Sequence, residues 1–170
     1  DQKQLEERMS RPTEADIAAM RAIEGDVLIL GVGGKMGPTL AQLIRRSADA
    51  AEKKIRVMGV ARFSDKTMPD ALRTHGIEPI ACDLLEPEEL AKLPDAENVI
   101  FMAARKFGTT GSEHLSWAIN TQLPALVADR YCKSRIVCFS SGNVYPLVPV
   151  VQGGATERTP VAPQGEYAQS

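Results

Sequence analysis

Several residue types that mark particular protein classes are scarce in this sequence of 170 residues. Its three cysteines, Cys82, Cys132 and Cys138, form no C-x-x-C pair, and His75 and His114 stand apart, so neither a disulfide framework nor a metal site is indicated. We expect the cysteines to be small buried hydrophobes in a reducing compartment, which predicts a cytoplasmic protein. Both histidines are expected on helix surfaces.

A strong charge imbalance and long apolar runs are also missing. The net charge of −2 gives no electrostatic reason to expect nucleic acid or an anionic membrane as a partner. No apolar run approaches the length of a membrane span, and no basic-then-apolar signal segment opens the sequence. With 44% hydrophobic and 25% charged residues, the composition is that of an ordinary soluble domain with a sizeable core.

The stretch 26–37, DVLILGVGGKMG, is the segment around which the sequence is organised. Its aliphatic residues 27–30 predict a strand buried on both faces. Beyond the glycines, Leu40 and Leu43 recur at helical spacing behind Pro38, a residue that suits the first turn of a helix. A strand, a glycine turn and a helix N-terminus together predict a phosphate site, because unpaired N–H groups and the positive end of the helix dipole meet there.

Two glycine spacings fit this turn. Gly31 and Gly33 begin a G-x-G-x-x-G frame that fails at Met36, whereas Gly31, Gly34 and Gly37 complete G-x-x-G-x-x-G, the frame that we adopt. The alternative is a tight turn that needs positive φ and binds nothing. The strand before it and the helix after it favour nucleotide binding.

The order of the predicted elements indicates the fold class. Residues 1–24 are predicted as a helical extension: residues 1–10 are either a tag remnant or a frayed helix, and a helix capped by Thr13 packs on the sheet edge or on a partner. Residues 25–170 are predicted as an α/β, Rossmann-type domain, a doubly wound parallel sheet with strand order 3-2-1-4-5. Its strands are expected at 27–30, 55–63, 77–82, 98–104 and 134–140, its helices at 38–53, 69–75, 87–93 and 112–131 (the last bent by Pro124), and a long functional loop at 142–166.

The residue type after the second strand bears on the choice of cofactor. An acidic residue there accepts a hydrogen bond from the ribose of NAD, but this sequence has Ala61 and Arg62, with Lys35 in the glycine turn. Two cations favour a 2′-phosphate and hence NADP, unless both are solvated surface residues. Asp65 and Asp70 are expected to lie too far past the strand. Asp83, after the third strand, either accepts from the adenine amino group or caps the following turn.

The later motifs resemble a known family. The run Ser140-Ser141-Gly142-Asn143-Val144-Tyr145 and the segment Glu157, Pro160, Pro163 and Tyr167 follow the glycine turn, the Asp83-Leu84 pair and the strand 99–104. As a set, these motifs make residues 26–170 resemble the N-terminal portion of an extended short-chain dehydrogenase/reductase, the NAD-dependent epimerase/dehydratase family. The cofactor-binding residues that we expect are Gly31, Gly33, Gly34, Lys35, Met36, Gly37, Ala61, Arg62, Asp83, Leu84, Ala103, Ala104, Asn120 (which matches a recurrent family asparagine) and Ser140.

The resemblance implies two catalytic residues. Ser141 orients the substrate hydroxyl or carbonyl, and Tyr167 is the general acid/base during hydride transfer to or from the nicotinamide. A free tyrosine has a pKa of about 10, so this role needs a nearby cation. The family places a lysine four residues after the tyrosine, a position just past Ser170. Where family dehydratases carry an acidic pair, this sequence has Gly142-Asn143, which favours epimerisation or carbonyl reduction over dehydration.

The predicted function is therefore an NAD(P)-dependent epimerase or oxidoreductase acting on a nucleotide sugar or a related hydroxyl compound. The family's C-terminal substrate domain is absent from the sequence, so we expect a fragment that turns over no sugar by itself, and a homodimer is a further expectation. Two alternatives remain open: a non-catalytic dinucleotide sensor of the same fold, and a relative that has lost its cofactor.

Overall fold

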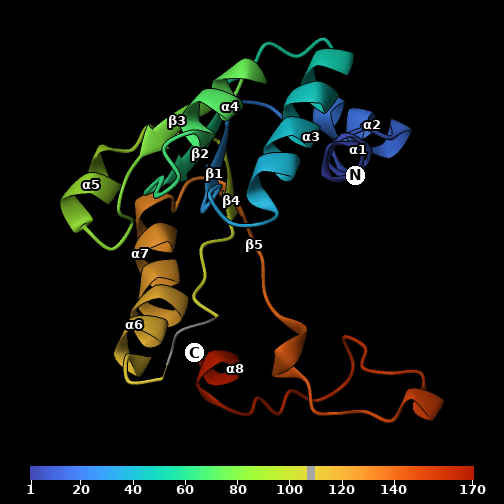
Figure 1. The fold of residues 1–170 in the computed structure, drawn as a ribbon, viewed down its shortest axis with the longest axis vertical. Coiled ribbons are helices and arrows are strands. Elements are labelled where there is room, and N and C mark those ends of the chain that lie inside the picture. Colours follow the sequence, from blue (N-terminus) through green and yellow to red (C-terminus); the bar gives the residue numbers. More distant parts are fainter. Residues whose placement is uncertain (107–109) are drawn as a thin grey trace.

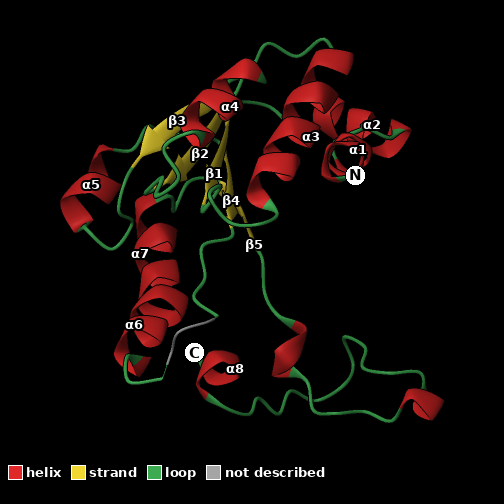
Figure 2. Ribbon diagram, viewed as in Figure 1, coloured by secondary structure: helices red, strands yellow, loops and turns green. Residues whose placement is uncertain are grey.

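The computed structural model, which describes residues 1–106 and 110–170, contains one five-stranded sheet in the order β3-β2-β1-β4-β5 (Figures 1 and 2). All four neighbouring strand pairs are parallel. The predicted fold class and strand order are thus confirmed. The strands are β1 (Val27–Leu30), β2 (Val57–Ala61), β3 (Glu78–Ala81), β4 (Asn98–Phe101) and β5 (Arg135–Cys138).

Helices cover both faces of the sheet (Figure 1). Alternate residues of β1 point to opposite faces and therefore belong to two separate cores. Val27 and Ile29 belong to the core under α3 (Gly37–Ala50) and α4 (Met68–Thr74). Leu28 and Leu30 belong to the opposite core, which α5 (Pro87–Lys92) and the helix through residue 130 close. Both faces of the central strand are therefore buried, as its uninterrupted aliphatic sequence predicts.

The long helix predicted at 112–131 is present but is not uniform. It runs as α6 (Glu113–Trp117), a π-helical turn η1 (Ala118–Gln122) and α7 (Leu123–Arg130). Pro124 is the second residue of α7 and has no N–H to donate. The irregularity that we expected at this proline therefore lies in the turn before it, where the wider π-helical hydrogen bonding occurs.

The N-terminal extension packs on α3 and not on the sheet edge, which was one of the two places predicted for it; packing on a partner stays a prediction. Residues 1–10 are not frayed, because they form the capped helix α1 (Gln2–Met9), which α2 (Glu14–Ala22) follows. Both terminal nitrogens of Arg46 in α3 donate to Glu7 at 2.9 Å, and one also donates to Ser10 at 3.0 Å. This bidentate contact fastens the extension to the outer side of α3.

The cysteine prediction is correct for Cys82, which is 5% exposed, and wrong for Cys132 and Cys138, which are exposed. Cys138 lies in β5, an edge strand whose four residues are all exposed. Past β5 the chain leaves the sheet and passes through the short 3₁₀ turns η2 (Gly142–Val144) and η3 (Val150–Gln152) before it returns at α8 (Glu166–Gln169) (Figure 1). The long loop predicted at 142–166 is present in this segment.

Two further observations concern the described residues. His75 and His114 are exposed on α4's end and on α6, as expected. No helix within the described ranges is long and apolar enough to cross a membrane.

Candidate functional site: a groove along the carboxyl ends of the strands

The glycine turn connects β1 to α3, and two of its glycines are required by the backbone itself. Gly31 has a φ of +94°, and a Cβ built on it would lie 2.6 Å from the Ala103 nitrogen at the end of β4. A Cβ on Gly37 would overlap the carbonyl of Val32, so only glycine lets α3 begin this close to the strand. In the frame of glycines 31, 34 and 37, the first and the last position therefore require glycine for structural reasons.

Gly34 has no such internal reason, because a Cβ there would meet only the Gly31 oxygen at 3.5 Å, an ordinary contact. It is exposed, and Lys35 and Met36 follow it at the start of α3. The backbone N–H groups of Lys35 and Met36 donate to no other residue of the described chain. Free amides at the positive end of a 14-residue helix beside a bare glycine are the features that an anionic ligand uses.

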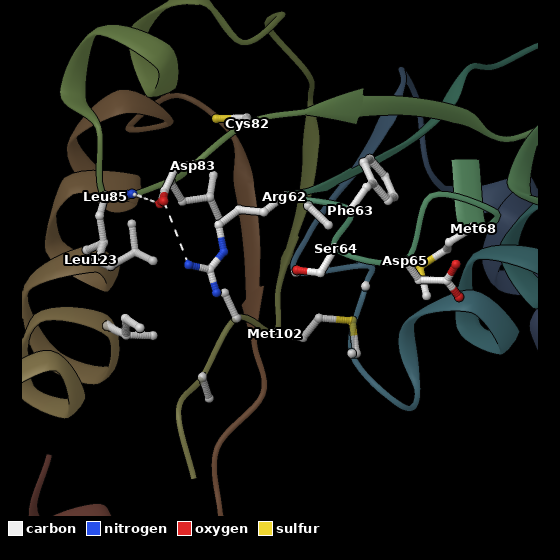
Figure 3. A pocket seen from close by; sticks show the side chains of 18 residues that line it. Arg62, Phe63, Ser64, Asp65, Met68, Cys82, Asp83, Leu85, Met102 and Leu123 are labelled. Atoms are coloured by element: carbon white, nitrogen blue, oxygen red, sulfur yellow. Dashed lines mark hydrogen bonds and ion pairs between the residues drawn. The ribbon is translucent and has the colours of Figure 1, made fainter. Parts of the chain in front are cut away.

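A cavity of about 430 Å³ lies beside this turn, at the carboxyl ends of β1 to β4 (Figure 3). Arg62 extends across it from the end of β2 toward Asp83, which follows β3, and the two side chains form an ion pair of 3.8 Å. The Arg62 side chain is 69% exposed, so this long pair is weak. The predicted residues that line this cavity are Gly31, Gly33, Gly34, Ala61, Arg62, Asp83, Leu84, Ala103 and Ala104.

Two acidic residues line this cavity, and only Asp65 departs from the expectation. Asp83 does cap its turn, since its Oδ1 accepts from the Leu85 amide at 3.1 Å, yet its carboxylate also lines the cavity. Asp65 was expected to lie too far past β2, but it lines the same cavity. The amide and then the hydroxyl of Thr67 lower the pKa of the Asp65 carboxyl, at 2.9 and 2.7 Å. Asp70 lies elsewhere and pairs with Arg73.

A second cavity of about 340 Å³ adjoins the first, and both are lined by Gly34, Met102, Ala103 and Ala104. The two cavities therefore form one groove along the carboxyl edge of the sheet, the place where ligands of doubly wound folds bind. The predicted residues that line only the second cavity are Lys35, Met36, Asn120, Ser140, Ser141 and Tyr167. Of the predicted site residues, only the buried Gly37 lines neither cavity, because it packs against Val32.

One grouping expected from the sequence is not formed. Lys35 lines the second cavity and Arg62 the first, so the two cations do not share one cavity. The order of the strands explains this, because Lys35 shares its cavity with residues of β4 and β5, whereas Arg62 follows β2 on the other side of β1.

Comparison with known proteins gives the same architecture. No protein-family model and no curated protein matches the sequence. Among solved structures, the ADP-L-glycero-D-manno-heptose-6-epimerase of Helicobacter pylori superposes with a TM-score of 0.69 at 20% identity, over 92% of this chain and 49% of that one. For the UDP-glucuronic acid 4-epimerase of Bacillus cereus, in complex with NAD, the values are 0.64, 18%, 85% and 47%. For the UDP-N-acetylglucosamine 4-epimerase of Methanobrevibacter ruminantium they are 0.62, 19%, 86% and 46%.

The chain has the fold of the extended short-chain dehydrogenase/reductase enzymes. It spans about half the length of these solved chains. At identities of 20% and below the likeness concerns the fold, and within that limit it confirms the resemblance seen in the sequence motifs.

Several residues of the groove in this short-chain dehydrogenase/reductase fold were missed by sequence reasoning. Met102 lines both cavities, and its place directly before Ala103 at the end of a predicted strand was the available signal. Phe63, with a φ of +50°, forms a turn just past β2, which ends earlier than the predicted second strand. This turn brings the next residues back to the groove. No sequence signal indicated this turn, and the other missed residues that it carries to the groove are Ser64, Asp65 and Met68.

Proposed function

We propose that this chain binds NADP or NAD along the groove and forms the cofactor half of an epimerase or oxidoreductase that transfers hydride at a hydroxyl-bearing carbon. The observation that carries the proposal is the continuity of the groove, which joins the glycine turn to Ser141 and Tyr167. The nucleotide-sugar substrate class is proposed because solved chains of the same fold are named as epimerases of ADP- and UDP-sugars.

The groove suits a dinucleotide at its centre. The two cavities meet at Gly34 and lie next to the unpaired amides of Lys35 and Met36. A diphosphate placed there accepts hydrogen bonds from these amides, and the absence of a side chain on Gly34 lets it approach. An adenosine then fits the cavity beside Arg62, and the reactive ring fits the cavity beside Tyr167.

The residues around the second cavity define the proposed chemistry. Bound nicotinamide supplies the carbon that gives or accepts hydride. As the phenolate, Tyr167 takes the proton of the substrate hydroxyl when that carbon is oxidised, and as the phenol it returns the proton on reduction, while the Ser141 hydroxyl orients the substrate oxygen. Ser141 is held at the start of η2, where its Oγ accepts from the Asn143 amide at 3.1 Å. No carboxylate follows Ser141, so this site favours epimerisation or carbonyl reduction.

Arg62 is the basis for proposing NADP over NAD. Its guanidinium is largely exposed, and its weak pair with Asp83 leaves it able to turn toward a 2′-phosphate and bind it bidentately. The carboxylate of Asp65, which would favour an unmodified ribose, is held on its own turn by two hydrogen bonds from Thr67, both to Oδ1. A cytoplasmic location and a homodimer stay predictions.

Fluorescence titration of the chain with NADPH and with NADH tests the proposal. We expect both to bind, with NADPH tighter by about tenfold, and Arg62→Gln to remove that difference. Asp70→Asn, a charge change outside the groove, serves as the control and should leave both affinities unchanged. Failure of both cofactors to bind would contradict the proposed function, and equal affinities would contradict the preference for NADP.

A further inference from the structure

Tyr167 has a cation above its ring in the described part of the chain. The Nζ of Lys106, five residues after β4, lies 5.6 Å from the centroid of the Tyr167 ring in α8. An ammonium at this distance is attracted by the electrons of the ring face. We propose that Lys106 is a positioning residue that holds the Tyr167 ring and favours its phenolate during proton transfer, which rests on the proposed function.

The physical basis is the charge that develops on the phenol oxygen. When a tyrosine acts as a base, its oxygen is negative, and a positive charge held beside the ring lowers the free energy of that form. Lys106 supplies this charge from the loop after β4, whatever residue follows Ser170. The same contact fixes the ring plane, because the attraction is strongest over the face of the ring.

A single side chain ties the two segments that carry Lys106 and Tyr167. Asn120 accepts a hydrogen bond from the Arg105 amide at 2.8 Å and donates to the Arg105 carbonyl at 3.1 Å. The same carboxamide nitrogen donates to the Ser170 hydroxyl at 3.0 Å. Asn120 therefore fixes the residue before Lys106 and the end of α8 relative to each other, which makes the contact a constrained one.

Two further hydrogen bonds hold α8 at both of its ends. The Trp117 indole donates to the Glu166 carboxylate at 2.6 Å, and the Thr121 hydroxyl donates to the Ser170 carbonyl at 2.8 Å. Both donors and Asn120 come from the last residue of α6 and from η1, so this one helical stretch presents all three side chains to α8. The bond from Trp117 also engages the one carboxylate adjacent to Tyr167, whose charge would otherwise oppose that of a phenolate.

Tyrosine nitration by tetranitromethane tests this inference without a cofactor or turnover, because the reagent attacks the phenolate. Wild type, Lys106→Met and Lys106→Arg would be treated at pH 8, and nitration of each tyrosine would be followed by peptide mass spectrometry. We expect Lys106→Met to slow nitration of Tyr167 by about threefold or more and Lys106→Arg to keep the wild-type rate. Tyr145 provides the internal reference, and Lys133→Met, an exposed lysine after α7, is the matched control.

The outcome is decided by the comparison of the two Lys106 variants. Equal nitration of Tyr167 in Lys106→Met and Lys106→Arg, or a faster rate in Lys106→Met, overturns the proposal. The emission of Trp117, the only tryptophan, reports whether α8 stays docked. Since nitration is measured on the free protein, a failure of NADPH to bind would count against the proposed function and would leave this result standing.

Discussion

The strands β1 (VLIL) and β5 (RIVC) lie in the same sheet, and both carry aliphatic residues, but their surroundings are very different. No residue of β1 is more than 2% exposed, whereas Ile136 and Val137 of β5 are 37% and 59% exposed. β1 lies between two strands and under helices on both faces, whereas β5 is an edge strand. Aliphatic residues in the sequence therefore predict a strand well, but they do not predict how completely that strand is covered in the fold.

The two cavities of the groove differ in the same way, in how closely the chain around each of them is packed. The cavity beside Arg62 lies at the carboxyl ends of β1 to β4, where Gly31 packs closely against Ala103. The cavity beside Tyr167 depends on the segment after β5, in which Leu147 and Val151 are 104% and 95% exposed. That segment is returned to the fold by the hydrogen bonds of α8 to Trp117, Asn120 and Thr121. The two halves should respond differently to matched substitutions.

The largest difference is expected for a pair of isoleucines. Ile29→Ala in β1 removes a fully buried side chain and should lower the free energy of unfolding by about 4 kcal/mol, because it leaves a cavity in the core. Ile136→Ala in β5 should cost less than about 1 kcal/mol, because much of its side chain is already in water. Urea unfolding curves of both variants measure the two values, and equal losses would remove the distinction between the strands.

A pair of glycines should give a smaller difference. Gly37→Ala forces a Cβ into the Val32 carbonyl and should destabilise the fold by roughly 2–3 kcal/mol, since the start of α3 must move. A Cβ on Gly142, which starts η2, meets nothing within 4 Å, and Gly142→Ala should change stability by less than about 0.5 kcal/mol. Thermal melts followed by circular dichroism compare them. A stable Gly37→Ala protein would show that α3 is not anchored as described.

The smallest effect concerns the pH dependence of stability at the start of β1. Burial raises the pKa of the Asp26 carboxyl, but hydrogen bonds from the Arg56 amide at 2.8 Å and guanidinium at 2.7 Å outweigh this, and the net pKa lies below its ordinary 3.8. A depressed pKa stabilises the fold above the ordinary value, and this stabilisation is lost as the pH falls through the lowered one. Asp26→Asn should remove about 1 kcal/mol at pH 7 and flatten the fall in stability below pH 4.

Urea unfolding at pH 7 and at pH 3 measures this effect, with the exposed Asp70→Asn as the control. An Asp26→Asn protein whose stability falls between these values as steeply as that of the wild type would assign the pH dependence to other carboxylates.

Local patterns in the sequence predicted the parallel sheet, its strand order and the glycine turn, because burial on two faces and the needs of a tight turn restrict which residues occur there. They failed where the outcome depends on distant parts of the chain. The exposure of Cys138 depends on what covers the edge strand, and the arrival of Asp65 at the groove depends on the turn at Phe63. The contact between Lys106 and Tyr167 joins residues far apart in sequence through Asn120, and no spacing rule indicates it.

The central claim is that a cofactor diphosphate rests on the amides at the start of α3, and Gly34 tests it most directly. A Cβ at Gly34 meets only the Gly31 oxygen, at an ordinary contact distance, and Gly34 lines both cavities. NADPH titration of Gly34→Val, alongside its thermal melt, is the decisive measurement. We expect Gly34→Val to melt at the temperature of the wild type and to bind NADPH tenfold or more weakly. This is a loss of binding free energy on the order of 1.4 kcal/mol. A stably folded Gly34→Val protein that binds NADPH as tightly as the wild type would contradict it.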